Sequence, residues 1–290
     1  MHTPMATSSD TTAKQSLRLC YSPCPNDTFI FYGLAHGRVD AAPYAFDIAL
    51  ADVEELNRRA AAGAVEVCKV SASAAAGLVE DWWILAAGGA LGFGCGPLVV
   101  THRPCDFNEL RDQPLAIPGR MTTAHLLLQL HGVHRGPVVE MSYERIMPAV
   151  ARGEVAAGLI IHEGRFTYAA AGLHLALDLG VWWEQTIGLP LPLGVIVAKR
   201  SLGRAAALRI EAAIRDSLRY GRSHAAEAMH YVRSHAQELD EQVIGRHIQS
   251  FVNDLSLDPG ASGRQSIALL LKKAAALAGR PLPDITLFPG

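Results

Sequence analysis

Apolar, strand-like runs alternate with helix-like stretches along most of this chain, and this alternation constrains its fold more than any other feature. Between residues 17 and 87, short runs with strand character are separated by stretches with helical character. The same alternation starts again at Pro114 and continues to Asp178. It is typical of α/β proteins, in which helices cover a sheet of largely parallel strands. The sequence therefore predicts two α/β units.

Two stretches rich in glycine or proline separate these units. Residues 88–96 lack the GxGxxG pattern of a dinucleotide-binding loop and lead into a strand-like run, so we expect a flexible or bulged crossover there. A second crossover is expected at residues 190–194, before another strand-like run. From Leu202 onward the sequence is almost wholly helical, apart from a proline-rich tail that starts at Pro281.

Two α/β units joined by two crossovers predict a fold with two lobes. This is the layout of the periplasmic-binding-protein-like fold (type II), in which each lobe is a mixed sheet flanked by helices and the cleft between the lobes holds a small ligand. The expected boundaries are residues 16–97 and 195–290 for a discontinuous first lobe, 98–194 for the second lobe, and 1–15 for a disordered tail.

The composition excludes several classes of function. Half of the 290 residues are hydrophobic, 19% are charged and the formal net charge is −2, which gives no electrostatic basis for binding nucleic acid or a membrane surface. No apolar run is long enough to span a bilayer. Residues 1–15 lack the apolar segment of a secretory signal, and the five cysteines form no CxxC pair. We therefore expect a cytoplasmic protein with reduced thiols.

The histidines give no sign of a metal site. His224, His230, His235 and His247 lie in polar, helical surroundings without an HExxH spacing, and we interpret them as part of a solvated helix face. The sequence therefore predicts neither a metal nor a cofactor.

One histidine stands out because of what precedes it. The apolar, β-branched run 159–161 ends abruptly at His162 and is typical of a buried strand of a parallel sheet. A side chain just past the carboxyl end of such a strand lies at the edge where open α/β sheets bind ligands. Imidazole has a pKa near neutrality, so His162 is a candidate general base. The alternative is a histidine that caps the strand and bonds to a backbone carbonyl.

Two strand-to-helix junctions could hold an anion. Thr122 and Thr123 follow a predicted strand and begin a predicted helix, where hydroxyl and N–H groups favour negative charge. The alternative is that Thr122 is simply an N-cap. Lys69, Val70 and Ser71 form a similar junction in the first unit, with Ser71 as the natural cap. Lys69 is either a solvated charge, which these residues alone favour, or a cation directed into the cleft.

A third junction, residues 22–28, contains two prolines that stiffen the loop. Asn26 or Asp27 is expected to cap a helix from about Thr28, and Ser22, Asn26 and Asp27 are candidate cleft-lining residues. Cys24 could be a nucleophile, but no base is adjacent in the sequence, so packing is the favoured role. One histidine, one lysine and several hydroxyl and amide groups suit proton transfer on an anionic substrate.

Together, four ordered segments resemble the 1,4-dihydroxy-6-naphthoate synthase family of the futalosine route to menaquinone. They are SPCPNDTFIF (22–31), GGALG (88–92), PGRMTTA (118–124) and GLIIHE (158–163). The segments GLPLPLG (188–194) and HAQEL (235–239) match as well, and the resemblance covers about residues 17 to 258.

The resemblance implies a two-lobed lyase that converts cyclic dehypoxanthinylfutalosine to 1,4-dihydroxy-6-naphthoate and releases dihydroxyacetone. It implies that His162 is the proton acceptor and that Lys69, Val70, Ser71, Thr122 and Thr123 bind the substrate, although Val70 stands where the family leads us to expect leucine. The implied partner is a small, carboxylate-bearing molecule. The alternatives are chorismate dehydratase of the same pathway and a protein that binds a small acid without turnover.

Overall fold

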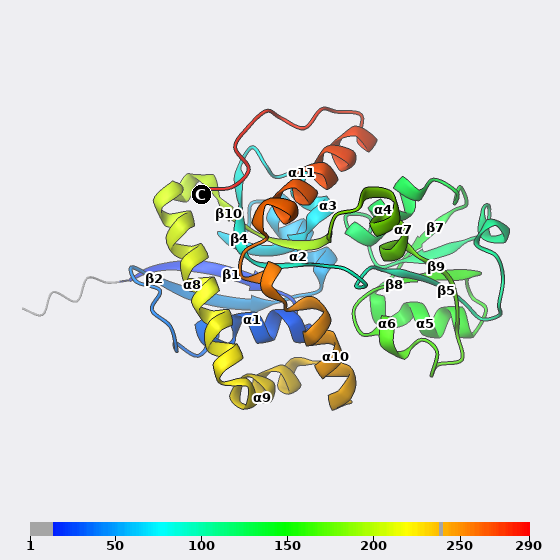
Figure 1. Cartoon of the computed structure of the whole chain (residues 1–290), viewed down its shortest axis with the longest axis horizontal. Coiled ribbons are helices and arrows are strands. Elements are labelled where there is room, and N and C mark those ends of the chain that lie inside the picture. The colour runs from blue at the N-terminus through cyan, green and yellow to red at the C-terminus, as the bar shows by residue number, and fades with distance from the viewer. Residues whose placement is uncertain (1–13, 238–239) are drawn as a thin grey trace, which may run out of the picture.

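Two mixed sheets form the centres of two lobes, which lie side by side in Figure 1. The structure is a computed structural model that describes residues 14–237 and 240–290. The expected N-terminal tail lies outside the described residues as far as residue 13, and so do residues 238–239 of the HAQEL segment. The predicted α/β class is confirmed, because each sheet is flanked by helices.

The first sheet is built from segments far apart in the sequence. It contains β1 (Gln15–Tyr21), β2 (Tyr44–Leu50), β3 (Val67–Ser71), β4 (Trp82–Gly92) and β10 (Leu191–Lys199). The order across the sheet is β2-β1-β3-β10-β4. β1 is parallel to β2 and β3, whereas β10 lies antiparallel between β3 and β4. The late strand β10 therefore completes a sheet that the N-terminal region begins.

The second sheet is formed by one continuous part of the chain. It contains β5 (Leu98–Thr101), β6 (Leu115–Ile117), β7 (Val138–Glu140), β8 (Ala157–Ile160) and β9 (His174–Asp178). The order is β7-β6-β8-β5-β9, in which β6 is parallel to β7 and β8, and β5 is antiparallel to its two neighbours. Both sheets are therefore mixed, as the sequence predicts.

Helices cover both sheets (Figure 1). Those of the first lobe are α1 (Pro25–Ala35), α2 (Val53–Ala61), α3 (Ala72–Ala75), α8 (Arg204–Ser223), α9 (Ala225–His235), α10 (Glu241–Phe251) and α11 (Gly260–Leu277). Those of the second lobe are α4 (Thr123–His131), α5 (Tyr143–Ala151), α6 (Gly164–Thr167) and α7 (Leu179–Ile187). Across the described residues, no helix has the length and apolar character needed to cross a membrane.

The apolar core is continuous between the lobes. One cluster of buried side chains includes Val70 and Leu91 from the first sheet and Leu115 and Leu159 from the second. Burial of such side chains from water is the main stabilising contribution to folding. The two lobes therefore share one apolar core, to which strands of both sheets contribute.

The expected crossovers are strands rather than loops. Residues 88–92 belong to β4 of the first sheet, and residues 191–194 belong to β10 of the same sheet, so the chain passes between the two sheets next to these strands. Leu91 pairs with Pro192, and the pairing of β4 with β10 has register shifts on both sides of Gly194. Glycine is needed at Gly88, because a Cβ atom there would lie 2.9 Å from Cγ1 of Ile196. The glycines thus permit close strand packing.

The first helix starts earlier than the sequence predicts. α1 begins at Pro25, its N-cap is Cys24, and no side chain caps it. Proline suits this first position because its fixed φ is helical and it has no N–H to satisfy. The expectation that Asn26 or Asp27 caps a helix from Thr28 is therefore wrong. Both residues lie in the first turn of α1, which leaves their side chains free for the interactions described below.

Candidate active site

The loops that follow parallel strands of both sheets meet at a pocket with about 750 Å³ of empty space. The first lobe contributes six of the residues predicted from the sequence: Ser22, Asn26, Asp27, Lys69, Val70 and Ser71. The second lobe contributes the other three, Thr122, Thr123 and His162. The fold thus brings every predicted site residue to one place, because the carboxyl ends of β1, β3, β6 and β8 point toward the gap between the sheets.

His162 has an unusual backbone conformation. It follows β8 and is the one non-glycine residue with a positive φ, 55°, in the described part of the chain. The left-handed region is sterically unfavourable for residues with a Cβ atom and is kept only where the surroundings impose it. This strain directs the ring away from the strand and into the pocket between the lobes.

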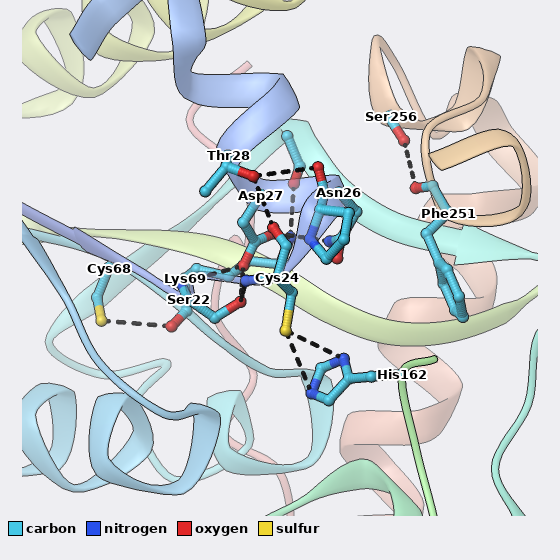
Figure 2. Close-up of polar contacts among 12 residues, drawn as sticks. Ser22, Cys24, Asn26, Asp27, Thr28, Cys68, Lys69, His162, Phe251 and Ser256 are labelled. Atoms are coloured by element: carbon cyan, nitrogen blue, oxygen red, sulfur yellow. Dashed lines mark hydrogen bonds and ion pairs between the residues drawn. The ribbon is translucent and has the colours of Figure 1, made fainter. Parts of the chain in front are cut away.

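Both lobes hold the His162 ring. The sulfur of Cys24, from the first lobe, lies 3.4 Å from Nδ1 and 3.6 Å from Nε2, as Figure 2 shows. The Tyr143 ring, from the second lobe, meets the imidazole edge-on with centroids 4.9 Å apart. Among the described residues, the ring nitrogens thus contact a thiol. Within that part of the chain they do not bond to a backbone carbonyl, as they would if His162 only capped the strand.

Cys24 remains a thiol in this environment. Burial is the main cause that raises the pKa of Cys24 well above its ordinary value, and the Glu163 carboxylate adds to the effect. A neutral thiol is a weak nucleophile, so the structure favours a contact role for Cys24. The histidine beside it stands 138 positions away in the chain, which is why a search for an adjacent base missed the pair.

Lys69 forms a buried ion pair. Its Nζ lies 2.7 Å from Oδ1 of Asp27 and donates to the carbonyl of Gly88 at 3.0 Å. The two side chains are only 6% and 3% exposed, so the interpretation of Lys69 as a solvated charge is wrong. Oδ2 of Asp27 accepts from the hydroxyl of Ser22 at 2.8 Å, and Oδ1 also accepts from Nδ2 of Asn26 at 2.7 Å. Burial of the pair fixes these groups at the wall of the pocket (Figure 2).

His247 extends this network into α10. It is fully buried, so its interpretation as part of a solvated helix face is wrong. Its Nε2 lies 2.9 Å from Oδ1 of Asn26. Because Nδ2 of Asn26 donates to a carboxylate, Oδ1 must accept, and Nε2 of His247 therefore carries a hydrogen. Nδ1 has no hydrogen-bond partner among the described residues and lies 3.9 Å from Oε1 of Glu163.

Replacing His247 with glutamine is expected to make the protein less sensitive to acid. Burial, with a smaller effect of His162, lowers the pKa of His247 well below its ordinary value of 6.5. Below pH 6.5, His247 binds a proton in the unfolded chain but stays neutral in the folded protein. The free energy of unfolding therefore falls by up to about 1.4 kcal/mol per pH unit. Glutamine retains an N–H for Asn26 but does not titrate. Thermal unfolding of parent and His247→Gln between about pH 7.5 and 5 measures this difference; identical pH dependence in both proteins would contradict the assignment.

The two threonine hydroxyls are occupied by the protein itself. Oγ1 of Thr122 donates to the carbonyl of Gly119 at 2.7 Å and caps α4 by accepting from the N–H of His125. Oγ1 of Thr123 donates to the carbonyl of Leu193 at 2.8 Å and accepts from the N–H of Ser73 at 3.1 Å. The groups that remain for an anion are N–H groups in the first turn of α4, which have no partner within the helix.

Thr123→Val is therefore expected to lower the stability of the protein. The valine has nearly the same volume, but the Ser73 N–H and the Leu193 carbonyl each lose a partner. A polar group left without a partner in such surroundings costs about 1–3 kcal/mol. Urea unfolding of Thr123→Val and of Thr123→Ser, which keeps the hydroxyl, measures the effect. Equal unfolding midpoints for the two variants would show that these bonds do not stabilise the contact between the lobes.

The hydroxyl of Ser71 is oriented by a buried asparagine. Oδ1 of Asn57 accepts from the N–H of Ser71 at 2.8 Å, and Nδ2 donates to its Oγ at 3.1 Å. Because Oγ accepts that bond, the hydroxyl hydrogen of Ser71 is free to donate into the pocket. Asn57 is fully buried and was not predicted from the sequence, since nothing in a helical pattern distinguishes it.

The model of the protein family described as menaquinone biosynthesis matches residues 17–276, which are most of the 290 residues of the chain. The chain belongs to the menaquinone biosynthesis family. A relative from Thermus thermophilus, named 1,4-dihydroxy-6-naphthoate synthase, is 48% identical over 92% of this chain and 99% of the relative. A relative of the same name from Streptomyces coelicolor is 46% identical over 94% and 99%.

Solved structures agree with the fold. A protein from Archaeoglobus fulgidus, 36% identical, superposes with a TM-score of 0.85 and covers 91% of this chain and 98% of that one. The alkanesulfonate-binding protein SsuA from Xanthomonas axonopodis is 16% identical, with a TM-score of 0.67 over 96% and 97% of the two chains. The second likeness shows the fold alone. The periplasmic-binding-protein-like fold predicted from the sequence is thus confirmed for this member of the menaquinone biosynthesis family.

The pocket of this menaquinone biosynthesis family member also contains a cation that the sequence did not suggest. Arg165 lines the pocket, and its guanidinium donates to the carbonyl of Gly96 and to Oδ2 of Asp178, each at 2.7 Å. The available signal was its position three residues after His162, just after the strand end. In the described residues, no group of three or more His, Cys, Asp or Glu side chains is arranged to hold a metal ion.

Proposed function

We propose that this chain is a 1,4-dihydroxy-6-naphthoate synthase, a carbon–carbon lyase of menaquinone biosynthesis. The reaction divides cyclic dehypoxanthinylfutalosine into 1,4-dihydroxy-6-naphthoate and dihydroxyacetone. The observation that carries the proposal is the position of His162, whose strained backbone places it in the pocket between the lobes. The chain is also 46–48% identical to two relatives of that name. A histidine in this position can accept the proton whose removal begins fragmentation.

The pocket has an apolar part that suits the ring of such a substrate. Val53, Leu56 and Phe251 line it, together with backbone from both lobes. Polar groups orient the substrate at the edges of this apolar surface, which is the usual composition of a small-molecule site. The hydroxyl of Ser71 donates from the first lobe, and the N-terminal turn of α4 supplies N–H groups from the second. These donors would bind the carboxylate and oxygen substituents of the substrate.

His162 would take a proton from the bound substrate, and the carbon–carbon bond then breaks. Cys24 contacts the imidazole as a neutral thiol, so it adds no negative charge that would repel an anionic substrate. The ion pair of Lys69 with Asp27 keeps the pocket wall rigid during this step. Formation of an aromatic product supplies driving force that the protein need not provide.

Incubation with separate substrates tests this proposal. The purified protein is mixed with cyclic dehypoxanthinylfutalosine or with chorismate, and the products are identified by mass spectrometry. We expect 1,4-dihydroxy-6-naphthoate and dihydroxyacetone in equal amounts from the first substrate and no change in the second. Dehydration of chorismate would favour chorismate dehydratase instead. Binding of either compound followed by its release unchanged would favour a protein that captures a small acid.

A further inference from the structure

A second, smaller cavity adjoins the pocket at His162. It has about 380 Å³ of empty space and shares Ser22, Val53 and His162 with the main pocket. Its other walls come from the loop at Cys24, from Asp52 at the start of α2, from the start of α5, and from Gln237. The candidate base therefore lies where two compartments meet.

The two compartments differ in charge. The main pocket is lined by two cations, Lys69 and Arg165, and by one carboxylate, Asp27, which is paired with Lys69. The small cavity is lined by the carboxylates of Asp52 and Glu144 and by neither lysine nor arginine among its described lining residues. Carboxylates repel an anionic ligand but accept hydrogen bonds from hydroxyl groups. The charges thus place an aromatic carboxylate in the main pocket and a neutral, hydroxyl-bearing group in the small cavity.

The small cavity also offers hydroxyl groups. Ser142 is the N-cap of α5 but makes no side-chain cap bond, so its hydroxyl is available to a ligand. Burial raises the pKa of Tyr143, which keeps its phenol protonated. Asp52 caps α2 through Oδ1, which leaves Oδ2 available. A small molecule with several hydroxyl groups could be bound by these donors and acceptors together.

We propose that the small cavity is the subsite for the three-carbon, polyhydroxylated part of the substrate, which leaves as dihydroxyacetone. The inference rests on the proposed function. In this arrangement the aromatic carboxylate part occupies the main pocket, and the bond that breaks lies beside His162, at the junction of the two compartments. The substrate divides between its two products without any other reactant. Ser142, Tyr143 and Glu144 then determine which leaving fragment the enzyme accepts.

Filling the small cavity tests this assignment. Ser142→Leu adds bulk at a helix cap that makes no side-chain bond, so the fold should tolerate it. We expect kcat/KM for cyclic dehypoxanthinylfutalosine to fall about tenfold or more, as overpacking of a binding cavity typically causes. The Kd of 1,4-dihydroxy-6-naphthoate, measured by calorimetry, should stay within about twofold of the parent, because that product occupies the other compartment. Ser201→Leu, at an exposed position outside both cavities, is the matched control and should change neither value.

Failure of the subsite assignment and failure of the proposed function give different results in this experiment. Parental kcat/KM in Ser142→Leu, or an equal loss of turnover and of naphthoate binding, would overturn the subsite. If Ser142→Leu does not fold, Ser142→Ala removes the hydroxyl without added bulk and should raise KM for the substrate while leaving naphthoate binding unchanged; unchanged KM would overturn the subsite in that case. A parent protein that releases no dihydroxyacetone would instead overturn the proposed function, and the subsite with it.

Discussion

His162→Asn is expected to fold like the parent and to lose turnover by about 10²–10⁴-fold, the usual cost of removing a general base. Asparagine keeps a polar head but cannot accept a proton near neutral pH. It is also one of the few residues that tolerate a positive φ, so the substitution adds no strain at the backbone angle of 55°. The loss should appear mainly in kcat, because proton transfer occurs in the transition state.

Two measurements on the same preparations distinguish a base from a structural histidine. Turnover and thermal unfolding are measured for the parent, for His162→Asn and for His162→Gly, which relieves the backbone strain and also lacks a base. Both variants should lose turnover, because neither asparagine nor glycine supplies a base. A near-parental kcat in His162→Asn, together with a lowered melting temperature, would rule out His162 as the base.

Lys69→Met is expected to lower the free energy of unfolding by about 3–5 kcal/mol, because it leaves the buried Asp27 carboxylate without its cation. Methionine fills most of the space of the lysine stem, so the lost charge is the main change. Loss of the donor to the Gly88 carbonyl adds to the effect. Chemical unfolding in urea gives the free-energy difference directly.

The companion variant for this prediction is Lys69→Met combined with Asp27→Asn. With the charge of the carboxylate removed as well, most of the lost stability should return, since the cost comes from an uncompensated charge rather than from lost packing. Additive effects of the two single substitutions would mean that the ion pair is not what stabilises this wall of the pocket.

The fold was predictable where local sequence carries the signal. Strand runs and helical stretches were recognised because burial on two faces or on one stripe leaves a periodic pattern. Pairing across the chain leaves no such pattern, so the sequence does not give the register in which residues 90–92 pair with residues 191–194. Helix α7 (Leu179–Ile187) was missed although its caps were visible: Asp178 accepts from two N–H groups at its start, and Gly188, with φ 72°, ends it.

The candidate site was predictable at strand ends and not elsewhere. Residues at the carboxyl ends of parallel strands, or just after them, converge because the sheet aligns these ends, and every site residue predicted from the sequence lies in such a place. His247 does not, because its burial depends on how α10 packs against the first lobe. A signal was present: His247 lies three residues after Ile244 and four before Phe251, on the buried face of an amphipathic helix. Buried histidines on such a face warrant attention when a site is sought.

The position of β10 also affects how the protein is made. All strands of the second sheet lie between Leu98 and Asp178, so the ribosome synthesises them one after another, with no strand of the first sheet among them. In the first sheet, β10 lies between β3 and β4, so these two strands cannot be joined until residues 191–199 have been synthesised. During that interval the edges of β3 and β4 are unpaired, and unpaired edges favour association with other chains. Vectorial synthesis thus completes the later lobe first, and the N-terminal lobe depends on the chain that follows it.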